Sequence, residues 1–218
     1  MSVHGVMTAK FALKAGVLLI AARINAHPVT VMLDPSTPVS IASDNVARRV
    51  GIDPAKPEAQ AVRHKPVIGL EATSVRLRTL RTGHVDAPAA MIVGNDVLRG
   101  TPILLDFARD RLHLPERGDA RHREARLQPI EATVTSDGCY SIAARDAAGQ
   151  PIHLAVVGTP ADLGGQGEAA TIGGRPVTAF LARDGRCPSS QALIGWDAFR
   201  EQQVLIDIPA SKLWLPTD

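Results

Sequence analysis

Aromatic residues and cysteines are the scarcest features of this 218-residue chain. Phe, Trp and Tyr make up 3% of it, too few for the stacking platforms that bind single-stranded nucleic acid. The two cysteines, Cys139 and Cys187, cannot form a disulfide scaffold and have no metal-ligand spacing. Both lie in the second half of the chain, so they could pair in an exported protein, but we expect two ordinary thiols.

Charge of one sign and long apolar runs are also missing. The net charge of +2 gives no reason to expect nucleic acid or a membrane surface as a partner. The apolar run Ala15–Ala22 follows two lysines and is similar to a signal-peptide core. Its end, Ile20–Arg23, recurs as Ile142–Arg145, which favours a strand. No run is long enough to insert in a membrane.

The compartment stays open on this evidence. The chain is cytoplasmic if its N-terminus is native, and periplasmic or secreted if a signal peptide was removed. The seven histidines are scattered without a metal-ligand pair, so we expect no metal and no cofactor. The glycines at 165 and 167 fit a nucleotide-binding pattern, but no helix pattern follows them, and we interpret this segment as a loop.

Each half of the chain ends with the same pattern. Met91–Pro115 aligns without a gap to Ala192–Pro216 at an offset of 101 residues. This repeat is too long for a solenoid unit and predicts a duplicated domain. Eight pairs are identical: Gly94/Gly195, Asp96/Asp197, Arg99/Arg200, Leu104/Leu205, Asp106/Asp207, Leu112/Leu213, Leu114/Leu215 and Pro115/Pro216.

The repeat predicts two lobes, residues 1–115 and 129–218, joined by a charged linker at 116–128. In the first lobe the pattern predicts a hairpin around residues 25–28, a short helix over Asn45–Val50 closed by Gly51, and a closing hairpin over Ile103–Leu114. The second lobe is abbreviated. The repeated aspartates are interpreted as capping and turn residues, and Trp196 and Trp214 as core residues.

Val29–Ile52, with the sequence VTVMLDPSTPVSIASDNVARRVGI, resembles the active-site segment of retropepsin-like aspartic peptidases. The later segments VGNDVL and LLDFARDRLHL, and their counterparts LIGWDAF and LIDIPASKLWL, resemble the family's Gly-containing segment and closing hairpin. The resemblance covers nearly the whole chain, once per lobe. It implies an all-β, bilobal fold: two β-barrel-like lobes with a cleft between them that binds an extended peptide or unfolded protein segment.

The resemblance implies roles for individual residues. Asp34 matches the catalytic carboxylate, and Thr37 keeps a supporting hydroxyl. Pro35 replaces the family's Thr or Ser, and Ser36 takes the position of its Gly. In the second lobe either Val156 or Val157 stands opposite Asp34, followed by remnants of the same loop at Gly158 and Thr159.

Aspartic peptidases need two carboxylates that share one proton. Because neither valine is acidic, the sequence predicts an aspartic endopeptidase scaffold whose activity is weakened or lost in the monomer. Asp162 could replace the missing carboxylate, or self-association could bring two copies of Asp34 together; the oligomeric state is open. The alternative function is a catalytically inactive pseudopeptidase that binds a peptide or a partner protein. A third is an assembly role through exposed strand edges.

Overall fold

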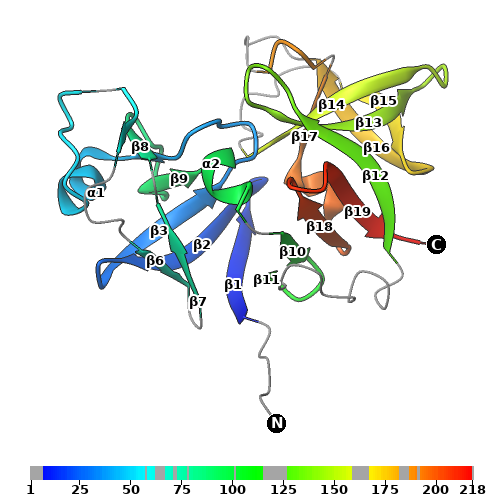
Figure 1. Ribbon diagram of the computed structural model, residues 1–218. Helices are drawn as coiled ribbons and strands as arrows, with labels where there is room; N and C mark the ends of the chain where they lie inside the picture. Colours follow the sequence, from blue (N-terminus) through cyan, green and yellow to red (C-terminus); the bar gives the residue numbers. More distant parts are fainter. Residues whose placement is uncertain are drawn as a thin grey trace.

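The computed structural model describes residues 7–56, 58–61, 67–70, 73–77, 79–100, 102–114, 127–158, 167–181, 187–190 and 192–217. Within these ranges strands dominate and the helices are short, which confirms the predicted all-β class. Figure 1 shows the strands of the first half, blue to green, on the left and those of the second half, yellow to red, on the right. No helix in the described ranges is long and apolar enough to cross a membrane.

The elements follow one another with short connections. In the first half they are β1 (Met7–Lys14), β2 (Val17–Ile24), β3 (His27–Leu33), β4 (Ile41–Ala42), α1 (Asp44–Arg49), β5 (Gln60–Ala61), β6 (Val67–Leu70), β7 (Thr73–Arg76), β8 (Thr79–Thr82), β9 (Met91–Val93), α2 (Asn95–Leu98), β10 (Ile103–Asp106) and β11 (Arg111–Leu114). In the second half they are β12 (Leu127–Val134), β13 (Tyr140–Asp146), β14 (Pro151–Val157), β15 (Glu168–Ile172), β16 (Arg175–Leu181), β17 (Ala192–Gly195), the 3₁₀ helix η2 (Trp196–Phe199), β18 (Gln203–Asp207) and β19 (Lys212–Pro216).

Local sequence patterns account for most elements of the first half. β2 and β3 form the predicted hairpin, and its turn at Asn25–Ala26 has positive φ at both residues, as tight hairpin turns require. The apolar run near the N-terminus lies in β2. The predicted helix is α1, and it ends at Gly51, whose φ of +78° suits a residue without a Cβ. The predicted closing hairpin is β10 and β11.

Six strands form one antiparallel sheet to which both halves contribute. Their order is β1-β11-β10-β18-β19-β12. In the central pair, Leu104 of β10 lies opposite Leu205 of β18, with Ile103 opposite Ile206 and Leu105 opposite Val204. Leu104 and Leu205 also match each other in the sequence repeat. The two closing hairpins therefore meet at equivalent residues, three strands on each side.

The few aromatic residues gather where the two halves pack together. Phe11 and Phe107 make an edge contact with ring centroids 5.3 Å apart. Phe107 lies 6.2 Å from Trp196, which in turn lies 6.4 Å from Phe199. All four belong to one core cluster that contains residues of both halves. Aromatic pairs of this kind stabilise a core beyond their buried area.

Some predicted boundaries are wrong. Leu127 and Gln128, predicted to belong to the charged linker, are the first residues of β12 and pair with β19; residues 115–126 lie outside the described ranges. The polar segment predicted as a loop over residues 54–66 contains β5. The glycine-rich stretch of the second half contains β15. Pairing with distant strands, which local composition does not reveal, explains all three.

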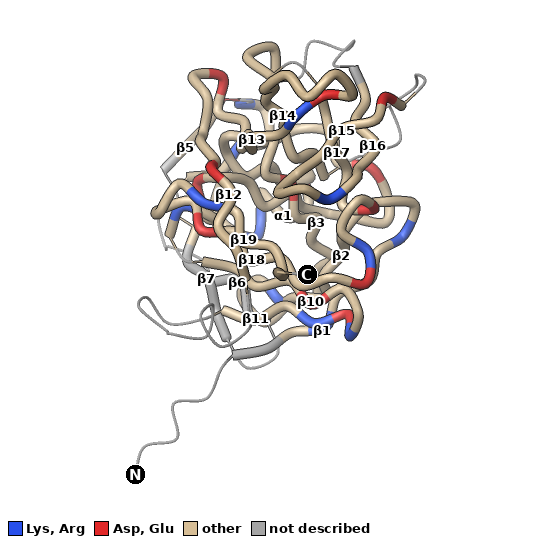
Figure 2. Tube along the Cα trace, turned by 90° about the vertical axis from the view of Figure 1, so that its right-hand side faces the viewer, with Lys and Arg blue, Asp and Glu red and all other residues tan. Residues whose placement is uncertain are grey.

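On the face shown in Figure 2, basic and acidic residues alternate around the described surface. The exception to this exposed pattern is Asp106 at the end of β10, which is 3% exposed. It accepts hydrogen bonds from Arg109 (2.7 Å) and from Gln203 of β18 (3.0 Å). Burial raises the pKa of Asp106, but these bonds and the Arg109 charge outweigh it and hold the pKa below 3.8.

Asp106→Asn tests this joint between the halves. Because the folded pKa of Asp106 is lowered, its ionised form stabilises the fold above pH 3.8, and this contribution is lost as the pH falls below that value. We expect the variant to lose about 1–2 kcal/mol of unfolding free energy at neutral pH. Urea unfolding at pH 7 and below pH 3.8 measures the difference, which should shrink in acid. A constant difference would contradict the assignment.

Candidate functional site

Asp34 follows the last residue of β3, in the middle of the molecule. β3 runs parallel to β9, with Leu33 opposite Val93, and the backbone N–H of Asp34 continues this ladder by donating to the Val93 carbonyl (3.0 Å). The strand is apolar because the sheet buries it on both faces. The Asp34 side chain is buried as well, at 4% exposure. A carboxylate in that position must be satisfied by hydrogen bonds.

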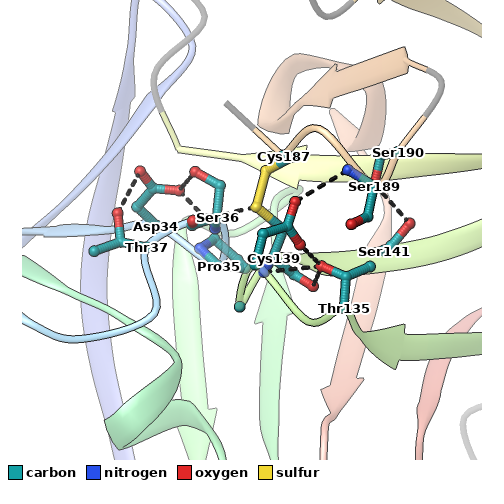
Figure 3. The surroundings of a disulfide bond; sticks show 12 residues. Asp34, Pro35, Ser36, Thr37, Thr135, Cys139, Ser141, Cys187, Ser189 and Ser190 are labelled. Atoms are coloured by element: carbon teal, nitrogen blue, oxygen red, sulfur yellow. Dashed lines mark hydrogen bonds between the residues drawn. A yellow bond between two sulfur atoms is a disulfide. The ribbon is translucent and has the colours of Figure 1, made fainter. Parts of the chain in front are cut away.

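Four donors surround the Asp34 carboxylate. Oδ1 accepts hydrogen bonds from the backbone N–H of Ser36 (2.9 Å), the Ser36 hydroxyl (2.6 Å) and the backbone N–H of Gly158 (2.9 Å). Oδ2 accepts one from the Thr37 hydroxyl (3.1 Å). Figure 3 shows Ser36 and Thr37 on either side of the carboxylate. The structure thus brings three of the predicted site residues and Gly158 together.

The strand register decides which valine stands opposite Asp34. β14 runs parallel to β17 as β3 runs parallel to β9, with Val156 opposite Ile194 and Leu33 opposite Val93. Since Ile194 is the repeat counterpart of Val93, Val156 corresponds to Leu33. Val157 therefore corresponds to Asp34, and Gly158 to Pro35. Of the two alternatives left open by the sequence, the structure selects Val157.

Gly158 touches the Asp34 loop directly. A Cβ at this position would lie 2.6 Å from the Leu33 carbonyl oxygen and 2.8 Å from the Asp34 Cα. Only glycine permits so close an approach of two backbones. The N–H that reaches the carboxylate thus comes from the position where the first half has a proline, which has no N–H to offer.

Two residues at equivalent repeat positions support the loops from below. Asn95 donates from Nδ2 to the Pro35 carbonyl (2.7 Å) and to the Gly138 carbonyl of the second half (2.6 Å). Its counterpart Trp196 donates from Nε1 to the Leu33 carbonyl (3.2 Å). Each therefore links the two halves. The sequence showed Trp196 as a core residue and did not single out Asn95, whose signal was its place after the repeated glycine.

A hairpin tip of the second half packs against the same loop. The Tyr140 N–H donates to the Pro35 carbonyl (3.0 Å). Gly138 lies against Pro38, where a Cβ would come within 2.5 Å of the proline ring. Cys139 Sγ is 3.5 Å from the Ser36 carbonyl oxygen. The Asp34 loop is therefore enclosed by backbone and side chains of both halves.

Cys139 and Cys187 form a disulfide, with their Cα atoms 5.6 Å apart. The expectation of two ordinary thiols is therefore wrong. The two residues are 48 positions apart in the sequence, and closing a loop of that size stabilises a fold by about 4 kcal/mol in the chain-entropy account. The bond lies in a small apolar cluster with Ala155, Val157 and Leu193.

The repeated aspartates bind local groups, as predicted. Asp96 accepts hydrogen bonds from the Ser40 N–H (2.9 Å) and hydroxyl (2.7 Å); burial raises its pKa, opposed by those bonds. Asp207 accepts from the Ala210 N–H (3.1 Å) in its turn. Asp197 pairs with Arg200 at 2.7 Å. Trp196 is fully buried and Trp214 is partly buried.

Two residues weighed as parts of the site, Thr159 and Asp162, lie outside the described residues. In the part of the chain that the structure describes, the hydrogen bonds of Asp34 come from hydroxyl and backbone groups, and none joins it to another carboxyl group. The same residues contain no group of three or more His, Cys, Asp or Glu placed to bind a metal ion.

No protein-family model matches the sequence, and a comparison with curated proteins gives no match. Among solved structures, basic 7S globulin from soybean has a TM-score of 0.58 at 8% identity, covering 98% of this chain and 95% of its own. Conglutin gamma, a basic 7S globulin from lupine seeds, has a TM-score of 0.55 at 9% identity, with the same coverage. A retropepsin-like aspartic protease from Rickettsia conorii matches at 0.37 and 16% identity, covering 50% of this chain and 89% of its own. The chain thus has a distantly aspartic-protease-like fold.

Substitutions of Asp34 separate its charge from its hydrogen bonds. Asp34→Ala leaves the donors of Ser36, Thr37 and Gly158 buried without an acceptor, and we expect a loss of about 3 kcal/mol or more of unfolding free energy. Asp34→Asn keeps an acceptor oxygen, and Thr37 can turn to accept from the new amide, so we expect about 1 kcal/mol. Urea unfolding of both variants measures this. Equal losses would show that the hydrogen bonds do not hold the loop.

Val157→Asp tests the register, with Val157→Asn as its uncharged control. A second buried carboxylate beside Asp34 has a raised pKa, so it destabilises the fold at neutral pH and is relieved as it becomes protonated in acid. We expect Val157→Asp to be less stable than Val157→Asn by about 3 kcal/mol at pH 7. Thermal unfolding from pH 7 to pH 4 should show this difference shrinking. A difference independent of pH would place residue 157 away from Asp34.

Proposed function

We propose that this chain is a pseudopeptidase: a protein that binds an extended peptide on an aspartic-protease-like scaffold without hydrolysing it. In this proposal Asp34 joins the two halves and does not activate water. Two lobes related by duplication, residues 1–115 and 129–218, would flank the peptide. The single observation that carries the proposal is the hydrogen bond from the Gly158 N–H to Asp34 Oδ1.

The occupancy of Asp34 Oδ1 supports the loss of hydrolysis. Aspartic peptidase chemistry needs a water molecule between two carboxylates, one of which is ionised while the other holds the proton. Here Oδ1 already accepts from Ser36 twice and from Gly158 once. The residue in register with Asp34 is Val157, whose side chain cannot hold or transfer a proton. The carboxylate is also 4% exposed, which leaves little room for water.

The symmetric sheet supports the two-lobe arrangement. Equivalent residues Leu104 and Leu205 face each other across β10 and β18, as expected for a pseudo-twofold axis between duplicated lobes. The paired loops at Asp34 and Gly158 lie on either side of such an axis. In the aspartic peptidases that the sequence resembles, a peptide lies extended over the paired loops. The proposal keeps this binding mode and removes the chemistry.

A second candidate function is a weakened aspartic peptidase. One observation favours it: the Thr37 hydroxyl binds Asp34 Oδ2 at 3.1 Å, as the resemblance implies for a catalytic carboxylate. This candidate needs a second acidic group from another source, either Asp162 or a second copy of the chain.

Cleavage and binding assays distinguish the two candidates. The wild type and Asp34→Asn are incubated with a fluorescently labelled unstructured protein between pH 3 and pH 6, and fragments are measured together with binding by anisotropy. For the pseudopeptidase we expect binding by both proteins and cleavage by neither. Asp34→Asn is the control because it keeps most of the loop contacts. Cleavage by the wild type that the variant lacks would establish the peptidase, and absence of binding by both would refute the peptide-binding role.

A further inference from the structure

The Cys139–Cys187 disulfide contacts both loops that meet at Asp34. On one side, Cys139 Sγ lies 3.5 Å from the Ser36 carbonyl oxygen of the Asp34 loop. On the other side, both cysteines pack against Val157, the residue before Gly158. Figure 3 shows the disulfide next to Pro35 and Ser36. The bond is therefore placed to influence the contact between Asp34 and Gly158.

The two cysteines are anchored unequally. Cys139 belongs to a hairpin tip that is also held by the hydrogen bonds from Tyr140 and Asn95 to the Pro35 carbonyl. Cys187 begins the segment 187–190, whose remaining ties to the hairpin are two hydrogen bonds. One joins the Ser189 N–H to Asp137 (3.1 Å) at an exposed position, and the other joins the hydroxyls of Ser190 and Ser141 (3.1 Å).

We propose that this disulfide is a redox-sensitive latch that controls how firmly Asp34 and Gly158 hold the two halves together. Reduction breaks the S–S bond, and two electrons and two protons from a dithiol reductant convert it to two thiols while the reductant closes to its own disulfide. The segment 187–190 then keeps only its two hydrogen bonds. Val157 loses the fixed packing of both cysteines, and the Gly158 N–H is no longer held against Asp34.

The burial of the sulfur atoms shapes how the latch works. Cys139 and Cys187 are each 3% exposed, so a reductant reaches them only when segment 187–190 opens locally. The pairing of β10 with β18 does not involve the disulfide, and it continues to join the halves after reduction. The expected reduced state is therefore folded, with loosened loops at residues 34–38 and 155–158. This holds whether or not a peptide binds.

Hydrogen exchange of the whole chain, before and after treatment with dithiothreitol, tests the proposal. The thiols are counted by alkylation and mass measurement. We expect complete reduction without denaturant and exchange at residues 34–38 and 155–158 that is about tenfold faster or more. Residues 103–106 of β10 serve as the internal control and should keep their protection. In a Trp214→Phe background, the Trp196 fluorescence should also shift, because its Nε1 donates to Leu33 beside the loop.

The variant with Cys139→Ser and Cys187→Ser provides a reduced-like state without reductant, and it should show the same local pattern. If this variant fails to fold, the dithiothreitol experiment on the wild type still decides. The proposal is overturned if reduction leaves both loops protected, if every segment including 103–106 exchanges at the same rate, or if the disulfide resists dithiothreitol until the chain is unfolded.

Discussion

The structure depends on one short contact, the hydrogen bond from the Gly158 N–H to the Asp34 carboxylate. It forms because two loops from different halves approach until a single Cβ would be too large. The contact fixes the end of β3 against the end of β14, and all neighbouring groups adapt to it. Ser36, Thr37, Asn95 and Trp196 each satisfy an oxygen atom in the Asp34 loop. A buried charge in this place is stable only while those donors remain.

The contact also explains why the chemistry and the architecture can be separated. A carboxylate that shares a proton with a second carboxylate must keep one oxygen available to water. A carboxylate that holds a backbone N–H uses that oxygen for structure. With Val157 in the opposing position, the same Asp34 performs the second task, and the loops meet without the repulsion that two carboxylates would bring. The closing hairpins need no such change, because their pairing serves only the sheet.

Local sequence patterns predicted those parts of the molecule that local interactions determine. Asp34 at a strand end, the helix before Gly51 and the hairpin of β10 and β11 follow from periodicity, turn residues and glycine positions. The choice between Val156 and Val157 did not, because it depends on how β14 aligns with β17 more than 30 residues later. The pairing of Cys139 with Cys187 and the role of Asn95 failed for the same reason: both are set by residues far apart in the sequence.

The unequal conservation of the two loops within one chain has a physical consequence for how they are stabilised. The first loop is held by side-chain donors of its own, Ser36 and Thr37. The second loop offers Gly158, which has no side chain, so its position must be fixed from outside. Val157 packs into the cluster around the disulfide, and the disulfide supplies the rigidity that the second loop lacks. A half that lost its carboxylate thus needs another constraint to keep its N–H in place, and the covalent bond beside Val157 is the strongest one that the described residues provide.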